Sequence, residues 1–208
     1  MPFRFFFVQN CSTTLSNQGL FGKENSSIMF AKLRNRKNAA DPASVQLLYH
    51  EIVETARRPE FYRDWQVPDT VEGRFEMLVL HIFFVLRRLQ EEKTANGTED
   101  PQAADFSQRL FDHMFLDMDH SLREQGVGDL GVPKRIRKMA KAFYGRVFAY
   151  ENGLKDGTLA AALHRNVYDG VDVEKKSSAA LARYAEKQYR HIMAQSAQDL
   201  MQGKIDWL

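Results

Sequence analysis

Apolar positions recur along this chain at the spacing of an α-helix, and strong helix-ending signals separate the segments in which they do so. After Asp41-Pro42, which can open a helix, Val45, Leu48 and Ile52 follow three or four residues apart, and Arg58-Pro59 ends the pattern. The chain contains no convincing run of alternating β-branched residues, the pattern expected of a strand. The sequence therefore predicts an all-α fold.

A second predicted helix begins at Asp69 or Thr70 and reaches about Lys93. It is apolar nearly all round between Met77 and Leu86, which is typical of a helix buried at the centre of a domain. That apolar stretch is too short to cross about 30 Å of bilayer hydrocarbon, so no transmembrane helix is predicted.

The remaining pattern predicts four more helices, separated by polar or glycine-rich turns. They are expected over about residues 102–125, 133–152, 158–168 and 178–201, and residues 61–68 are expected to form a compact aromatic loop. The whole pattern predicts a single-domain multi-helix bundle of about five to six helices with short turns, over residues 41–208. Residues 1–40 are expected to form a flexible N-terminal extension, within which Met29 is a plausible natural start.

The composition suits one domain with an ordinary core. The chain has 208 residues, of which 44% are apolar and 15 are phenylalanine, enough to bury a core without disulfides or metals. Cys11 is the only cysteine, which indicates a reducing compartment or indifference to redox conditions. Lys and Arg number 29 against 27 Asp and Glu, so any electrostatic recognition has to be local.

Charge is segregated between two consecutive predicted helices. Residues 99–129 carry eight acidic side chains against two arginines, whereas residues 134–146 carry six basic side chains and no acid. A short turn joins the helices, so they are expected to lie antiparallel, with their opposite charges attracting each other. The apolar stripe of the basic helix nevertheless leaves Lys134, Lys138 and Lys141 together on another face. That face is either merely solvated or binds a partner, and both interpretations stay open.

Three glycines in residues 126–131 match the G-x-G-x-x-G pattern of dinucleotide-binding loops. That pattern binds a nucleotide where a parallel strand delivers the glycines to a helix, but here a charged helix is predicted before them. We therefore interpret the segment as a helix-to-helix corner with four structural residues, Gly126, Gly128, Asp129 and Pro133. The N-terminus of the helix that follows is a fair site for an anionic group of a partner.

His113, Asp117 and His120 fall on one face of the acidic helix, where they could present metal ligands. Glu72 and Glu76 on the preceding helix could complete a carboxylate cluster of the kind that binds metal in helical bundles. The Glu-x-x-His pairs usual in such sites are absent, and Asp and His at helical spacing commonly form a solvated face. A metal-dependent helical-bundle enzyme is thus an alternative, but no metal ligand is assigned.

The predicted loop at residues 61–68 contains Tyr62 and Trp65 beside several arginines. Packing is the default role of such residues, although aromatic and arginine side chains on an irregular segment are also typical of protein-recognition hot spots. No Ser-His-Asp order, Cys-His pair or phosphate-binding loop supports covalent or phosphoryl-transfer chemistry. The residues therefore favour binding of another macromolecule, with an RNA or ribosome-binding adaptor as an alternative.

Ordered motifs between about residues 45 and 168 carry a further signal. They are Arg57-Arg58-Pro59-Glu60-Phe61-Tyr62, Val67-Pro68-Asp69-Thr70-Val71-Glu72-Gly73-Arg74-Phe75, Leu80-His81, Met118-Asp119-His120-Ser121-Leu122-Arg123-Glu124-Gln125-Gly126-Val127-Gly128-Asp129, Val132-Pro133-Lys134 and Phe143-Tyr144-Gly145-Arg146. Together they resemble the ubiquinol-cytochrome c chaperone family. The resemblance implies a helical assembly factor for the cytochrome b-containing respiratory complex, which holds newly made cytochrome b before that subunit joins the complex.

The resemblance also implies partners and a location. The expected partners are the cytochrome b client polypeptide and a second assembly factor or the ribosome, with peripheral contact with the inner membrane and no small-molecule substrate. The compact chain looks more like an alphaproteobacterial than a mitochondrial member, so the expected location is the bacterial cytoplasm at the inner membrane, or the matrix side in a eukaryote. The family offers no catalytic residue or cofactor to transfer, so no enzyme activity is expected.

A basic and aromatic surface is expected to contact the client, through Tyr62, Trp65, Arg74, Arg123, Lys134, Arg135, Lys138 and Lys141. The motif residues Arg74, Asp119, Arg123 and Asp129 are equally interpretable as internal partners that fix the turn. A surface that binds only soluble loops of the client would use charge, whereas one that covers transmembrane segments would need an exposed apolar groove. The sequence does not distinguish the two.

Overall fold

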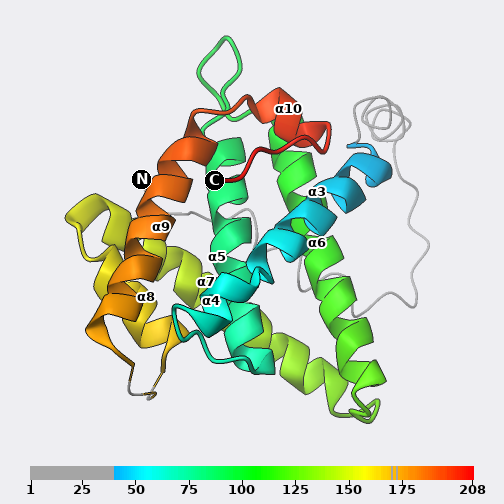
Figure 1. Ribbon diagram of the computed structural model, residues 1–208. Coiled ribbons are helices and arrows are strands. Elements are labelled where there is room, and N and C mark those ends of the chain that lie inside the picture. Colours follow the sequence, from blue (N-terminus) through cyan, green and yellow to red (C-terminus); the bar gives the residue numbers. More distant parts are fainter. Residues whose placement is uncertain (1–39, 170, 172) are drawn as a thin grey trace.

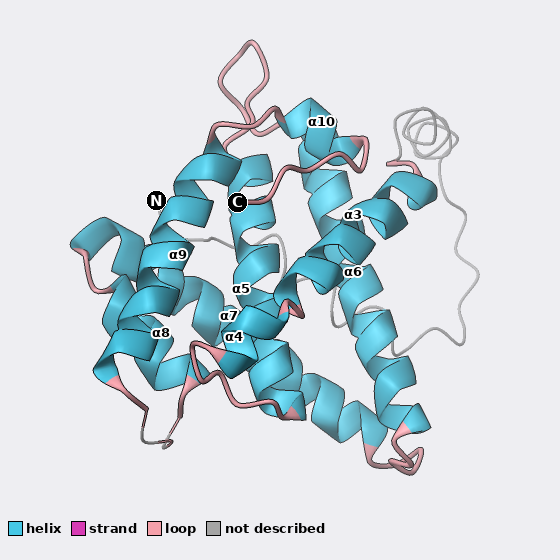
Figure 2. Cartoon of the chain, viewed as in Figure 1, coloured by secondary structure: helices cyan, strands magenta, loops and turns pink. Residues whose placement is uncertain are grey.

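Helices are the only regular elements in the part of the chain that the computed structural model describes, residues 40–169, 171 and 173–208 (Figure 2). They are α3 (Pro42–Ala56), α4 (Pro59–Arg63), α5 (Val71–Gln90), α6 (Pro101–Glu124), α7 (Val132–Asp156), α8 (Leu159–Val167), α9 (Lys175–Met193) and α10 (Ala197–Met201). None of these described helices is both long and apolar enough to span a bilayer. The predicted all-α, single-domain bundle is confirmed, and the predicted extension at residues 1–40 lies outside the described residues except for Ala40.

Helix α5 occupies the centre of the bundle, as its apolar sequence predicts. The Thr70 hydroxyl caps its N-terminus by accepting from the Gly73 N–H at 3.1 Å. Every residue from Phe75 to Leu86 is buried. Figure 1 shows α3 and α6 on one side of α5 and α8 and α9 on the other, and α7 contacts it as well. A helix that is covered on all sides can be apolar all round.

Helices α6 and α7 form the antiparallel pair that their short connection predicts. Phe111 and Phe143 lie at similar separations from the corner, and their rings pack 5.2 Å apart, with Phe115 at 6.3 Å from Phe143. Among the described residues, no ion pair joins an acid of α6 to a base of α7. Aromatic packing therefore holds the pair together, rather than the expected pairing of opposite charges.

Two predicted elements differ in kind from the structure, and several other helix ends differ by up to four residues, such as the end of α7 at Asp156 instead of about 152. The segment 61–68 begins inside the short helix α4 instead of being a loop throughout, because Pro59 starts a helical turn directly after Arg58. The predicted final helix at 178–201 is two helices, α9 and α10. Ser196 interrupts it in an extended conformation and caps α10, with its hydroxyl accepting from the Asp199 N–H at 3.4 Å.

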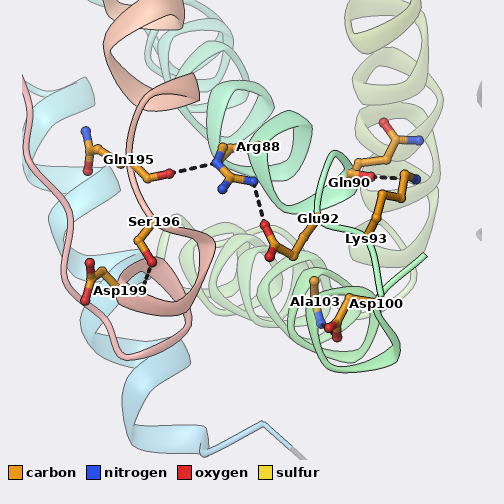
Figure 3. A network of polar contacts seen from close by, with 9 residues as sticks. All are labelled: Arg88, Gln90, Glu92, Lys93, Asp100, Ala103, Gln195, Ser196 and Asp199. Carbon is orange, nitrogen blue, oxygen red and sulfur yellow. Dashed lines mark hydrogen bonds and ion pairs between the residues drawn. The ribbon is translucent and has the colours of Figure 1, made fainter. Parts of the chain in front are cut away.

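The end of α5 fixes this break between α9 and α10 (Figure 3). The Arg88 guanidinium donates to the Gln195 carbonyl oxygen at 2.8 Å and to the Glu92 carboxylate at 3.0 Å. Arg88 thus satisfies a carbonyl group that the broken helix leaves without a helical partner. A contact across 107 positions of sequence, invisible to local periodicity, decides where α9 ends.

Candidate interaction surface

A tight corner joins α6 to α7 and sets the direction of the basic helix. Gly126 adopts a left-handed φ of 80° directly after the end of α6. Its N–H donates to the Arg123 carbonyl oxygen at 2.9 Å, and the Val127 N–H donates to the Leu122 carbonyl oxygen at 3.0 Å. This pair of bonds is the Schellman arrangement, which satisfies the last carbonyl groups of a helix and favours glycine at the positive φ.

The second half of the corner leads directly into α7. The Gly128 carbonyl oxygen accepts from the Gly131 N–H at 2.7 Å and from the Val132 N–H at 3.2 Å. Pro133 lies in the first turn of α7, where its missing N–H costs no helical hydrogen bond. Helix α6 precedes the glycines, so the strand that a dinucleotide-binding loop needs is missing at this place.

Arg123 ties the last turn of α6 to the corner. Its guanidinium pairs with the Asp119 carboxylate at 2.6 Å and also with Asp129. The hydrogen bond from Arg123 holds the pKa of the Asp119 carboxyl below its usual value. Arg123 is exposed, but it has two partners within the chain and would have to exchange them to bind a carboxylate of a client.

The first three turns of α7 carry five exposed basic side chains that have no ion-pair partner among the described residues, namely Lys134, Arg135, Arg137, Lys138 and Lys141. Helical geometry places Lys134, Lys138 and Lys141 along one stripe, with Arg137 beside it and Arg135 about a quarter turn away. The opposite side of the helix is buried through apolar residues such as Val132, Phe143 and Val147. The basic face is therefore a continuous surface open to solvent.

Arg146, the sixth base of this segment, faces inward instead. Its Nε lies 3.0 Å from both carboxylate oxygens of Glu76 on α5, and its Nη2 lies 2.8 Å from one of them. Glu76 is buried, and this burial raises its pKa against the opposing effect of Arg146. The two-pronged pair fixes the rotation of α7 on α5, which turns the lysine stripe outward.

The predicted contact Tyr62 packs into the bundle and is half-buried. Its hydroxyl donates to the Ala56 carbonyl oxygen at 2.8 Å, and burial raises its pKa to about 12. Trp65 is half-buried as well, with its ring 5.1 Å from Phe61 and 5.3 Å from Tyr184. Tyr62 therefore packs at the end of α3, and Trp65 packs between Phe61 of α4 and Tyr184 of α9.

Arg74 is exposed on the first turn of α5 and pairs with Asp69 at 2.7 Å. Like Arg123, it therefore has a partner within the chain. Of the eight predicted contacts, the structure brings four together on one helix face or its edge, and these four form no ion pair with any residue that the structure describes. These four are Lys134, Arg135, Lys138 and Lys141.

His81, which lies among the rings of Phe61, Tyr184 and Trp207, was not among the predicted site residues. His81 is fully buried, with Nδ1 at 2.7 Å from the Met77 carbonyl oxygen and Nε2 at 2.7 Å from the Tyr184 hydroxyl. Because a carbonyl oxygen only accepts, Nδ1 carries the proton and Nε2 accepts from Tyr184. Burial lowers the pKa of His81 to about 4, so the ring is neutral. In the sequence, the only sign of this buried polar group is that a single histidine interrupts the apolar stretch from Met77 to Leu86.

Several of the residues considered as metal ligands make other contacts within the protein. Asp117 accepts from the Tyr49 hydroxyl at 2.7 Å, and the His113 ring packs edge-on against the Tyr49 ring at 4.9 Å. Glu76 is held by Arg146. Within the described ranges, no group of three His, Cys, Asp or Glu side chains is arranged to hold a metal ion.

The described residues form an all-helical bundle that presents one cationic helix beside a corner held by internal ion pairs. Comparison with known protein families identifies the family of this helical domain. The chain belongs to the ubiquinol-cytochrome C chaperone family, whose model matches residues 63–207. The resemblance that the ordered motifs indicate is confirmed, and the match extends to the last helices, beyond those motifs.

Relatives with known names support the same assignment. The chain is 40% identical to the protein in the crystal structure of the Cbp3 homolog from Brucella abortus, with a TM-score of 0.70, over 86% of this chain and 96% of that one. It is 26% identical to ubiquinol-cytochrome-c reductase complex assembly factor 1 of Xenopus laevis, over 77% of this chain and 78% of the relative.

Other relatives are longer than this chain. The mitochondrial protein CBP3 of Saccharomyces cerevisiae is 26% identical over 76% of this chain and 46% of the yeast protein. The human assembly factor 1 is 26% identical over 77% of this chain and 52% of its own length. The chain therefore spans about half the length of these two proteins.

Proposed function

We propose that this protein is an assembly chaperone of the ubiquinol-cytochrome c reductase complex that binds newly made cytochrome b and acts without catalysing a reaction. Family membership and relatives named as assembly factors of that complex support the proposal. The observation that carries it is the exposed basic face of α7, whose cations have no ion-pair partner within the described ranges of the chain. Such a face can bind and release a polypeptide without any chemical step.

The proposed client contacts are Lys134, Arg135, Lys138 and Lys141, with Arg74 and Arg123 able to join by exchanging their internal partners. Charged side chains suit the soluble loops and termini of a membrane protein, whereas a surface that covers transmembrane segments needs a broad apolar groove. We therefore propose that the chaperone holds soluble segments of cytochrome b. Tyr62 and Trp65, which are half-buried against the core, are not among the proposed client contacts.

The proposed place of action is the face of the inner membrane at which cytochrome b is made. For a bacterial protein this is the cytoplasmic side, and for a mitochondrial one it is the matrix side. A second assembly factor or the ribosome is the proposed further partner, because release of the client needs a competitor for the basic face.

Deletion of the gene tests this function directly. Cells that lack the protein are expected to lose most of the reduced-haem absorbance of cytochrome b, and the wild-type gene should restore it. A chaperone with Lys134→Glu, Lys138→Glu and Lys141→Glu should accumulate to the normal level but fail to restore it, because three exposed charges are reversed on the client-binding face.

The matched control reverses two exposed bases on another helix, with Arg183→Glu and Lys187→Glu on α9, and is expected to restore cytochrome b fully. Normal cytochrome b absorbance in the deletion strain would overturn the proposed function. Binding of the purified protein to RNA through the same lysines, with normal cytochrome b, would favour the adaptor alternative.

A further inference from the structure

We propose that the outer face of α7 also docks on an anionic lipid bilayer. The outer face consists of Leu130, Lys134, Arg137, Lys138, Lys141 and Phe148. This inference deepens the proposed function, because it states that the chaperone meets its client at the level of the lipid headgroups. Only the meeting with the client rests on the proposed function. Binding to lipid can be measured with no client present.

Apolar side chains stand at both ends of the cationic stripe. Leu130, in the corner before α7, is 97% exposed, and Phe148, further along α7, is 61% exposed. These are the two highest exposures among the large apolar side chains of the described residues. Exposed apolar groups that flank cations are typical of surfaces that insert shallowly into the boundary between headgroups and acyl chains.

Helical geometry aligns the groups that lie within α7 itself. Lys134, Lys138, Lys141 and Phe148 follow one another at four, three and seven positions, so they share one side of α7. At a rise of 1.5 Å per residue, the stripe from Lys134 to Phe148 is about 21 Å long. With α7 lying in the plane of a membrane, the cations would meet phosphate groups while Phe148 enters the boundary region at one end of the stripe.

The charge of the face suits an anionic leaflet. Its cations have no ion-pair partner among the described residues, and the nearby Asp129 is already paired with Arg123. Each basic side chain near an anionic membrane surface strengthens binding about fivefold. Beside Phe148, a shallow groove of about 400 Å³ separates α7 from α8, and Arg165 at its lining adds a further cation.

A bilayer fits the face better than RNA does. Single-stranded RNA is held by cations together with aromatic rings on which bases stack, and a fully exposed leucine has no role in either contact. A lipid surface uses both the cations and the aliphatic tip. The position of Leu130 next to the stripe therefore favours lipid as the partner.

Flotation of the full chain with vesicles tests the inference. Binding is expected to vesicles of phosphatidylcholine mixed with phosphatidylglycerol, to fall with added salt, and to be absent with phosphatidylcholine alone. Leu130→Ser should weaken the affinity about tenfold or more. Lys138→Gln combined with Lys141→Gln should weaken it about 25-fold. Leu116→Ser, at a side chain 56% exposed on the acidic α6, is the matched control and should bind like the wild type.

Three outcomes would overturn the lipid proposal: no binding to anionic vesicles, equal loss with Leu116→Ser, or unchanged binding with Leu130→Ser. The protein could instead bind a single-stranded RNA through the lysines, with no effect of Leu130→Ser and no binding to vesicles. That result would identify RNA, and not lipid, as the partner of this face. Loss of a dimer with Leu130→Ser and no change in flotation would assign the face to a second copy. None of these results involves cytochrome b, so each is distinguishable from failure of the proposed function.

Discussion

At the scale of single residues, buried polar groups on α5 link it to helices on either side. Glu76 is paired with Arg146 on α7, and His81 accepts a hydrogen bond from Tyr184 on α9. A buried polar group without a partner is costly, so each link admits few rotations of the two helices about their axes. These two residues thus help to decide which side of α7 and of α9 faces solvent.

The burial of His81 makes the stability of the fold depend on pH. Its pKa falls from 6.5 to about 4 on folding, so between these values the unfolded chain binds more protons than the folded one. The stability that neutral His81 contributes is therefore fully present above pH 6.5 and is lost as pH falls toward 4. At about 1.4 kcal/mol per pKa unit, this loss amounts to about 3 kcal/mol.

His81→Phe removes the titrating ring and is expected to flatten the change in unfolding free energy between pH 7 and pH 4, as measured by urea denaturation. Tyr184→Phe is the control, because it removes only the hydroxyl partner and leaves His81 buried, the main cause of its low pKa. It should therefore keep the pH dependence. Parallel pH profiles of wild type and His81→Phe would show that His81 is not the titrating group.

At the scale of elements, the start of α5 depends on close contact with the preceding turn. A Cβ atom at Gly73 would lie 2.0 Å from the Pro68 carbonyl oxygen, which belongs to backbone and cannot move aside cheaply. Gly73→Ala is therefore expected to lower the free energy of unfolding by about 3 kcal/mol, near the upper end of overpacking costs. Chemical denaturation followed by helical circular dichroism measures this effect.

Gly145 in α7 provides a matched comparison. A Cβ atom there meets nothing within 4 Å, and its φ is not positive. Gly145→Ala should be neutral or stabilise the protein by up to about 1 kcal/mol, because alanine loses less backbone entropy in a helix. Equal effects of the two substitutions would contradict the account of the α5 start.

The local sequence pattern predicts most of the helices, the corner between α6 and α7, and the basic face of α7. The apolar run of α5, the capping signals at its start and the glycines after α6 each act within a few residues, so the sequence indicates a buried helix and a corner. The basic face of α7 follows from periodicity in the same way, since its buried stripe is regular.

Contacts between distant residues account for what the sequence did not indicate. Arg88 meets Gln195 across 107 positions, so the contact that supports the break before α10 is not visible in the local pattern, although Ser196 is a local cap for α10. Tyr184 lies 103 positions from His81, and it also covers Trp65, which is why a residue expected to be a client contact is half-buried. Periodicity gives the faces of a helix but not the element that covers each face.

At the scale of the whole molecule, a formal net charge of only +2 hides a strong local division of charge. The acids of α6 and the bases of α7 lie on adjacent helices without ion pairs between them in the described chain. The molecule is therefore not drawn strongly to every anionic surface, but it presents one face to such a surface in a defined orientation. The chain belongs to the ubiquinol-cytochrome C chaperone family, and we propose a partly assembled respiratory complex as the setting for that face.

Site-specific photocrosslinking of newly made polypeptides tests whether the basic face of α7 contacts cytochrome b. A photoreactive residue in place of Lys134 or Arg135 on α7, or of Lys187 on α9 as the control, would be placed in the full chain in cells that make the complex. After a short radioactive pulse, we expect a crosslink from the two α7 positions to newly made cytochrome b and little from Lys187. Equal crosslinking from α9, or crosslinks from α7 that contain no cytochrome b, would contradict this expectation.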